Sequence, residues 1–325
     1  QSKVIAVIKA NAYGHGLLNI AQALQGKVAA FAVARLEEAL VLRVAGVNEK
    51  ILVLQGCAQL QDMPEFQLHQ IDMVVHSVHQ VQWLETENTQ FTGDVWLKMD
   101  TGMHRIGIVP KDFMAVLVRL QQCKSLASIK LMTHFANADN TEDSKTRQQW
   151  QSFLATIKGN AQAELSAANS AAIVAWPETH ADWVRAGLML YGATPVVGKT
   201  AENLGLLPVM HFYARIIALK TVQIGDAVGY AGTWVAKKFS RLAVVSVGYG
   251  DGYPRQIKAG TCVLIHGQRC PIVGRVSMDM LSVDVSHHPS AAMGDRVTLW
   301  GKDLPVDEIA EQANTIAYTL LCAIT

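Results

Sequence analysis

The first half of the chain alternates short apolar runs with amphipathic stretches. Eight runs have the length and character of buried strands, at residues 3–9, 28–34, 50–55, 71–76, 93–100, 128–135, 163–169 and 184–192. Helical periodicity lies between them, most clearly at 36–46, 111–123 and 144–159. Strand–helix units in this number predict a (β/α)8 barrel of the TIM type. A doubly wound open sheet is the alternative, but the strand number and the placement of polar residues favour closure.

The pattern changes near residue 208, where β-rich runs joined by glycine turns replace the strand–helix alternation. These runs lie at 214–222, 226–234, 241–250, 261–267, 271–285 and 295–300. One helical segment, 306–323, follows them. The sequence therefore predicts an α/β protein with two domains: a barrel over residues 1–206 and a C-terminal, mostly-β domain over residues 207–325.

Polar side chains stand at the carboxyl ends of the predicted barrel strands, the face on which barrel enzymes carry their chemistry. They are Lys9, His76, Asp100, His134 and Asn169. Lys9 ends the apolar run KVIAVIK and opens into NAYGHG. A lysine amine forms covalent links with carbonyl compounds, pyridoxal phosphate among them. A strand-end lysine that simply reaches solvent is the alternative interpretation.

The string VIKANAYGHG, residues 7–16, resembles the cofactor-lysine segment of bacterial alanine racemases. Further matches follow in the same order through both domains: KMDTGMHRIG at 98–107, LMTHFANAD at 131–139, AANSAA at 167–172, WVRAGLMLYG at 183–192, AVGYAGTW at 227–234, VGYGDGYPR at 247–255 and GRVSMDM at 274–280. The resemblance implies a pyridoxal phosphate-dependent isomerase that interconverts L- and D-alanine. Its product would supply D-alanine for the peptidoglycan of the cell wall, or the enzyme would serve alanine catabolism.

The resemblance also assigns catalytic roles to three residues. Lys9 would hold the cofactor and move the Cα proton on one face of the substrate, and Tyr230 would act on the opposite face. Arg185 would meet the pyridine nitrogen of the cofactor. A guanidinium does not readily give up a proton, so the nitrogen would stay unprotonated and the ring would be a weaker electron sink, which limits transamination.

The remaining site residues are implied by the same resemblance. The cofactor-binding set is Lys9, Tyr13, Arg105, His134, Asn169, Ser170, Arg185, Gly187, Leu188 and Tyr318. Substrate contacts are expected from Arg105, Met278, Asp279 and Tyr249, with Arg275 nearer the entrance. Lys98 matches a lysine that is carbamylated in many family members and steadies the arginine at Arg105. The alternative for single residues such as His134, Arg105 or Arg185 is a purely structural role.

Composition narrows the possible partners. The net charge of +1 provides no long-range field for nucleic acid or an anionic membrane, and no apolar stretch approaches the ~20 residues of a membrane span. Five cysteines without CxxC spacing favour reduced thiols and a cytoplasmic location. Two histidine pairs, His76 with His79 and His287 with His288, lack a third ligand, so no metal is expected.

A phosphate-loop-like string, ATPVVGKT at residues 193–200, fits a linker between the domains better than a nucleotide site. Pro195 interrupts it, and the segment after it is too short for the helix that would bind phosphate. Both ends begin or stop close to apolar segments, so native sequence is expected beyond them.

The resemblance implies a homodimer in which each active site draws Lys9 from one subunit and Tyr230 from the other. Three alternatives share parts of the pattern. A broad-specificity or serine racemase would keep every catalytic residue and differ only in its pocket. A non-enzymatic pyridoxal phosphate carrier resembles a lone barrel, and the β domain argues against it. Amino-acid decarboxylases combine a barrel with a β domain, but an acid rather than Arg185 is expected at their ring nitrogen.

Overall fold

The computed structural model describes residues 1–86, 91–159 and 162–325, and the chain forms two compact units. Unit 1 comprises Gln1–Ala12, Gly16–Leu190 and Thr194–Thr200; unit 2 comprises Tyr13–His15, Tyr191–Ala193 and Ala201–Thr325. The domain boundary predicted after residue 206 stays a prediction.

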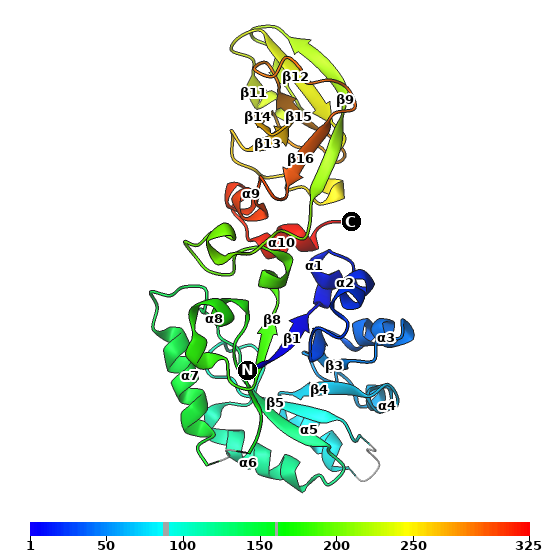
Figure 1. Ribbon diagram of the computed structural model, residues 1–325, viewed down its shortest axis with the longest axis vertical. Helices are drawn as coiled ribbons and strands as arrows, with labels where there is room; N and C mark the ends of the chain where they lie inside the picture. Colours follow the sequence, from blue (N-terminus) through cyan, green and yellow to red (C-terminus); the bar gives the residue numbers. More distant parts are fainter. Residues whose placement is uncertain (87–90, 160–161) are drawn as a thin grey trace. The chain divides into compact units, whose positions relative to one another are not determined.

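Unit 1 is built on a closed barrel of eight parallel strands in sequence order, which confirms the predicted fold (Figure 1). Strand β1 pairs with both β2 and β8 and so closes the barrel. The strands are β1 (Lys3–Val7), β2 (Ala30–Val33), β3 (Lys50–Val53), β4 (Ile71–Val75), β5 (Asp94–Lys98), β6 (Ser128–Met132), β7 (Leu165–Ser166) and β8 (Trp183–Ala186).

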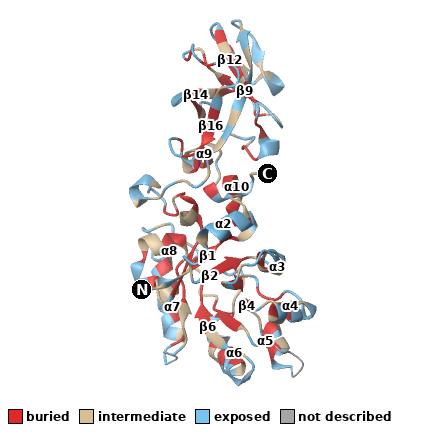
Figure 2. Cartoon of the chain, turned by 45° about the vertical axis from the view of Figure 1, so that its right-hand side comes forward, coloured by how far each residue is buried: buried red, intermediate tan, exposed pale blue. Residues whose placement is uncertain are grey.

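Helices lie outside the strands and cover the barrel (Figure 1). They are α2 (Leu17–Leu24), α3 (Leu36–Val44), α4 (Met63–Leu68), α5 (Val78–Glu85), α6 (Pro110–Gln122), α7 (Lys145–Thr156) and α8 (Ser170–Ala175), with 3-10 turns at Leu60–Asp62, Pro177–Thr179 and Leu188–Tyr191. Because helices cover the barrel and side chains fill it, strands such as β2 and β4 are buried at every position, as their continuous apolar runs predict (Figure 2).

Each barrel strand ends before its predicted apolar run does, and the last two strands end three and six residues early. Strand β7 keeps only Leu165–Ser166, and β8 ends at Ala186, after which Leu188–Tyr191 forms a 3-10 turn. Both departures occur where the chain turns into the loops that carry the candidate site. Apolar character alone does not mark the end of a buried strand, because the turn residues here are buried as well.

Unit 2 contains an antiparallel barrel, in agreement with the predicted mostly-β domain. Its strands follow the order β12–β15–β14–β13–β16–β9, with β9 also paired to β12. Their bounds are β9 (Phe212–Val222), β12 (Ser240–Val245), β13 (Cys262–Ile265), β14 (Gln268–Val273), β15 (Leu281–Asp284) and β16 (Arg296–Trp300). A separate two-stranded sheet joins β10 (Ala227–Val228) to β11 (Trp234–Val235).

The predicted helical segment at 306–323 divides into α9 (Val306–Gln312) and α10 (Ala317–Cys322). Asn314 has φ 52°, a left-handed conformation that a continuous helix does not permit. Within the residues that the structure describes, no helix has the length and apolar character needed to cross a bilayer.

Candidate active site

Lys9 stands just beyond the carboxyl end of β1 and is half-buried. The segment after it, labelled α1 (Lys9–Tyr13), is a left-handed turn: Ala10, Asn11 and Ala12 have φ of 54°, 53° and 53°. L-residues avoid this region at a cost of about 1–2 kcal/mol each, so the surroundings must hold the turn. Glu38 contributes by accepting a hydrogen bond from the Ala10 N–H at 2.7 Å. The strained turn therefore fixes the backbone directly after the lysine.

Lys98, the last residue of β5, is buried inside the same end of the barrel. Burial, together with the positive charges of Arg185, Arg105 and Lys9, lowers the pKa of its amine to about 7, against the opposing charge of Asp100. At neutral pH a substantial fraction of Lys98 is thus an uncharged amine. That is the form that acts as a nucleophile.

Arg185 on β8 is buried and tied to its surroundings by four hydrogen bonds. Its Nη1 donates to Ser166 Oγ at 2.7 Å, and its Nη2 donates to Thr133 O at 2.7 Å, Ala167 O at 3.1 Å and His134 Nδ1 at 3.2 Å. Burial lowers the pKa of Arg185 to about 10, so the guanidinium remains charged at neutral pH.

His134 follows β6 (Ser128–Met132), and its ring is neutral. Burial lowers its pKa well below the ordinary value, and the charges of Arg185 and Lys98 add to that effect. Because a guanidinium only donates, Nδ1 of His134 must be the acceptor, and the ring proton resides on Nε2. His134 therefore offers a single Nε2–H donor.

The loop after β5 is organised by the carboxylate of Asp100. Its Oδ1 accepts the N–H groups of Gly102, Met103 and His104, each at 3.0 Å. Burial raises the pKa of this carboxyl, but the three hydrogen bonds outweigh burial and leave the pKa lowered. The loop carries Arg105, which is exposed in this unit. Its positive charge nevertheless contributes to the lowered pKa of Lys98.

The predicted phosphate ligands Asn169 and Ser170 begin α8. Asn169 caps the helix, its Oδ1 accepting the Ala172 N–H at 3.0 Å. Ser170 is buried, and its Oγ accepts the N–H of Gly187 at 2.8 Å, which draws the loop after β8 to this helix. A hydroxyl that accepts in this way still has its own proton to donate. Leu188 opens the 3-10 turn that follows Gly187.

Unit 2 gathers three tyrosine rings. The ring of Tyr13 lies 4.8 Å from that of Tyr191 and 5.7 Å from that of Tyr318, measured between centroids. Burial raises the pKa of Tyr13, as does the neighbouring Tyr318, so the phenol stays protonated and can donate. Sequence reasoning named Tyr13 and Tyr318 but missed Tyr191, because nothing in its local string distinguishes it from a packing residue.

Tyr230 in unit 2 lies in a 3-10 turn (Tyr230–Gly232) between β10 and β11, and 68% of its surface is exposed. Gly229 before it has φ 74°, and Ala231 after it has φ 60°. This sharp turn places the side chain at the surface of its own unit. Its hydroxyl is therefore accessible to groups outside the unit.

Tyr249, also in unit 2, lies beside the loop containing Met278 and Asp279. Tyr249 N–H donates to Ser277 O at 3.0 Å, and Gly250 N–H donates to Met278 O at 2.7 Å. A Cβ at Gly248 would stand 2.3 Å from Ser277 O, so only glycine permits this approach. The expected substrate-contact residues of unit 2 are therefore neighbours in space.

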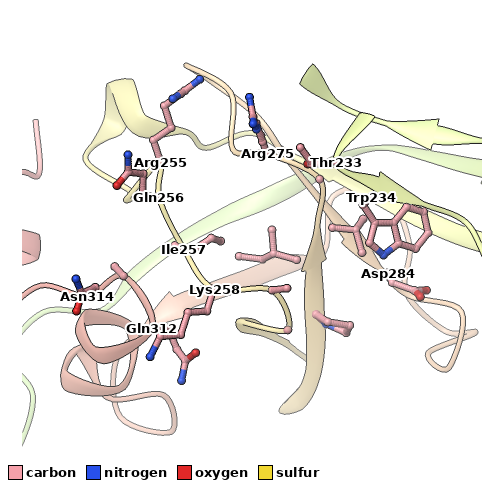
Figure 3. Close-up of a pocket in the computed structure, with 17 residues that line it drawn as sticks. Thr233, Trp234, Arg255, Gln256, Ile257, Lys258, Arg275, Asp284, Gln312 and Asn314 are labelled. Carbon is pink, nitrogen blue, oxygen red and sulfur yellow. The ribbon is translucent and has the colours of Figure 1, made fainter. Parts of the chain in front are cut away.

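A cavity of about 780 Å³ in unit 2 is lined by Arg255, Lys258, Arg275, Trp234 and Gln312 among others. Figure 3 shows Arg255 and Arg275 extending away from Lys258 and Gln312. The cations do not converge on one point, so the cavity does not form a compact anion site. Among the described residues, no group of three or more His, Cys, Asp or Glu side chains is arranged to hold a metal ion.

The described residues of unit 1 suit an anionic cofactor. The positive charges of Arg185, Arg105 and Lys9 act on the buried amine of Lys98, and the carboxylate of Asp100 opposes them. Desolvated positive charge of this kind is unfavourable unless negative groups join it. Pyridoxal phosphate brings a phosphate and a phenolate oxygen, and its carbonyl carbon suits a lysine amine. The donor set therefore fits this group.

Comparisons with known proteins cover the whole chain. Residues 1–195 match the family model described as alanine racemase, N-terminal domain, and residues 209–325 match that described as alanine racemase, C-terminal domain. An alanine racemase of Shewanella oneidensis is 47% identical over 325 residues, spanning all of this chain and 90% of the relative. Among solved structures, the biosynthetic alanine racemase from Pseudomonas aeruginosa has a TM-score of 0.96 at 42% identity, and the alanine racemase from Acinetobacter baumannii has a TM-score of 0.94 at 39% identity. Each match covers all of this chain and 90% of the other.

Proposed function

This chain belongs to the alanine racemase family, whose members are pyridoxal phosphate-dependent isomerases, and from that premise we propose that it interconverts L- and D-alanine. The observation that carries the proposal is the group of Lys9, Lys98, Arg105 and Arg185 at the carboxyl end of the parallel barrel. The family's cofactor fits this group of cations.

The cofactor, when bound, spreads the negative charge left on the substrate Cα after a proton is removed. Lys9 would anchor it covalently, and Arg185 would meet its ring nitrogen through a guanidinium that remains charged. The Nε2–H of His134 and the side chain of Arg105 would orient the ring. The phosphate would be held by Tyr13, Asn169, Ser170, Gly187, Leu188 and Tyr318.

Inversion at Cα requires a proton-transferring group on each face of the substrate. We assign one face to the amine of Lys9 and the other to the hydroxyl of Tyr230. Arg105, Met278 and Asp279 would receive the substrate carboxylate, with Tyr249 and Arg275 near the entrance. The exposed position of Tyr230 in its own unit supports a homodimer in which this phenol serves the site of a second subunit.

Lys98 is proposed to carry a carbamate, formed by CO2 on its uncharged amine. Its burial and its pKa of about 7 support this assignment, because an ordinary surface lysine is almost wholly protonated at neutral pH. A carbamate here would give the positive charge of Arg105 a negative partner.

We further propose a cytoplasmic location, which five cysteines without a disulfide favour.

The test is the loss of optical rotation of L-alanine on addition of purified protein and cofactor. We expect racemisation to a 1:1 mixture, with borohydride treatment abolishing activity and fixing the cofactor on Lys9. An adduct on Lys3 or Lys98 would contradict the assignment of Lys9. Equal turnover of serine or larger side chains would indicate a broad-specificity racemase, and cofactor binding without turnover would indicate a carrier.

A further inference from the structure

His76 and Lys98 occupy neighbouring positions at the carboxyl ends of adjacent strands. Strands β4 and β5 run parallel, with Val75 paired to Leu97 in register. Continuing this register by one residue, beyond the end of β4, brings His76 beside Lys98, and residues in such positions project from the same side of a sheet. The charge of Lys98 contributes to the lowered pKa of His76, so the two side chains interact electrostatically.

The ring of His76 is held in one orientation. Its Nε2 lies 3.0 Å from Gln55 O and 3.3 Å from Gln80 Nε2, so this ring nitrogen is held between a carbonyl oxygen and an amide nitrogen. Buried Gln80 on α5 fixes the backbone, because its Oε1 accepts the His76 N–H at 2.9 Å while its Nε2 donates to Cys57 O at 2.9 Å. Gly56, at φ 70°, leaves room for the side chain of Gln80 to make these two hydrogen bonds, since a Cβ at Gly56 would stand 2.7 Å from Gln80 Nε2.

The charges around this pair explain why His76 is neutral. Burial is the main cause of its lowered pKa, and Lys98 opposes protonation, while the bond to Gln55 O favours it. The other charged or titratable groups that face Lys98 are Lys9, Arg105, Arg185, His134 and Asp100. With three cations, Lys9, Arg105 and Arg185, against one carboxylate in that set, an additional proton on His76 is unfavourable while Lys98 carries its own positive charge.

We propose that His76 is a positioning residue for Lys98, taking up a proton when CO2 adds to the lysine amine and then stabilising the carbamate as its cationic neighbour. The inference rests on the proposed function, in which Lys98 carries a carbamate. The step forms one bond, from Lys98 Nζ to the carbon of CO2. Lys98–NH3⁺ and CO2 yield Lys98–NH–CO2⁻ and two protons, of which His76 takes one and water the other.

The charge of Lys98 changes from +1 to −1 in this step, which reverses its influence on the neighbouring ring. Repulsion that disfavoured imidazolium becomes attraction that favours it. Linkage makes the effect reciprocal, since a carbamate that raises the proton affinity of His76 is itself stabilised by the same factor when His76 is protonated. We expect a factor of about ten, corresponding to a rise of one in the His76 pKa.

Two measurements on the holoenzyme test the proposal. The first follows the His76 ring by NMR of ¹³C-histidine-labelled protein across pH, with CO2 removed and then with bicarbonate added. We expect its proton affinity to rise about tenfold with bicarbonate in the natural protein and to stay unchanged in Lys98→Met. The second traps the carbamate with a trialkyloxonium salt and measures the occupancy of Lys98 by peptide mass spectrometry.

In the trapping experiment, run at a pH below the His76 pKa, His76→Asn should raise the CO2 concentration for half-occupancy about tenfold, whereas His79→Asn, an exposed histidine on α5, should leave it unchanged. A carbamate on Lys98 with an unchanged His76 proton affinity would overturn this inference alone. The absence of any carbamate in the natural protein would overturn both the inference and the proposed modification. It would not contradict the proposed racemase activity, which is tested separately by the optical rotation of L-alanine.

Discussion

Nη2 of Arg185 lies 3.2 Å from Nδ1 of His134, and this contact makes Nδ1 the accepting nitrogen of the ring. A charged guanidinium beside the ring opposes a second proton on it, and burial opposes it more strongly. Arg185 in turn gains fixed acceptors at Ser166 and Thr133 and keeps its charge despite burial. The pair thus presents one permanent cation and one neutral Nε2–H donor at the carboxyl end of the barrel.

The first prediction concerns the pH dependence of this pair. The folded-state pKa of His134 lies well below its unfolded value, so the unfolded chain binds more protons as pH falls through about 6.5. Stability should therefore fall on acidification in that window. His134→Gln should remove this part of the pH dependence, measured by urea unfolding from pH 8 to 5. An identical pH profile in the variant would mean that His134 titrates normally in the folded protein.

The second prediction comes from the opposite, amino-end side of the barrel strands. The register Met73–Val95 places Asp72 beside Asp94, and both carboxyls are buried. Lys130 and Lys50 donate to Asp94, whose pKa is lowered to about 2, while burial and the charge of Asp94 raise the pKa of Asp72 to about 6. A raised carboxyl pKa stabilises the fold at low pH, and that contribution is lost as pH rises through about 6.

Asp72→Asn keeps the shape and removes the ionisation, so the variant should gain stability over the natural protein between pH 5 and 8. The gain should reach about 2–3 kcal/mol at pH 8. Trp96 and Trp183, which pack edge to face at 5.4 Å beside this network, allow unfolding of the barrel to be followed by fluorescence. Glu178→Gln, at an exposed position, is the control. A pH-independent difference would show that Asp72 does not titrate in this range.

The sequence predicted site residues best where their position follows from the direction of the barrel strands. Lys9, Asp100, His134 and Asn169 end or nearly end apolar runs, and in a parallel barrel such residues come to one face. Lys98 and Arg185 lie inside such runs and were named through the family resemblance. The pairing of Asp72 with Asp94 could not be predicted, because it depends on register between neighbouring strands. The hydrogen bonds of the Gln80 side chain to His76 and Cys57 could not be predicted either, because they depend on a loop conformation that the local sequence does not encode.

The left-handed turn after Lys9 also could not be predicted from the sequence, because alanine and asparagine at its positions have no intrinsic preference strong enough to impose it.

The third prediction concerns this left-handed turn after Lys9. Ala10 is exposed with φ 54°, so Ala10→Gly relieves about 1–2 kcal/mol of backbone strain and costs about 0.5–1 kcal/mol in chain entropy. A net stabilisation of about 0.5–1 kcal/mol is expected.

The same change of alanine to glycine in a right-handed helix should lower the stability of the fold instead of raising it. Ala23 is exposed within α2, and Ala23→Gly should destabilise by about 1 kcal/mol. Both variants are compared by thermal and urea unfolding. If Ala10→Gly destabilises as much as Ala23→Gly, the turn at Lys9 is not left-handed in solution.

The fourth prediction tests the second proton-transferring group. Tyr230→Phe removes only a hydroxyl from an exposed ring, so folding and cofactor binding should be preserved. Racemisation should fall by about 10²–10⁴-fold, the usual effect of losing a positioned acid or base. Exchange of the Cα hydrogen of one alanine enantiomer with deuterated water should persist through Lys9, while inversion is lost. Racemisation at the parental rate would exclude Tyr230 from the chemistry.

The fifth prediction tests whether the active site is shared between subunits. In a two-fold dimer such sharing is reciprocal, so Lys9→Ala and Tyr230→Phe each inactivate both sites of their own homodimer. When the two variants are unfolded together and reassembled, a hybrid dimer collects both lesions in one site and leaves the other intact.

Random pairing makes about half of the dimers hybrids, each with one working site in two, so roughly a quarter of the natural activity should return. Each variant refolded alone is the control and should stay inactive, while differently tagged subunits report how many hybrids form. Confirmed hybrids without recovered activity would place Lys9 and Tyr230 in the same subunit's site. In that case the exposed ring of Tyr230 would have to reach the barrel of its own chain, and a monomer would be expected to retain full activity.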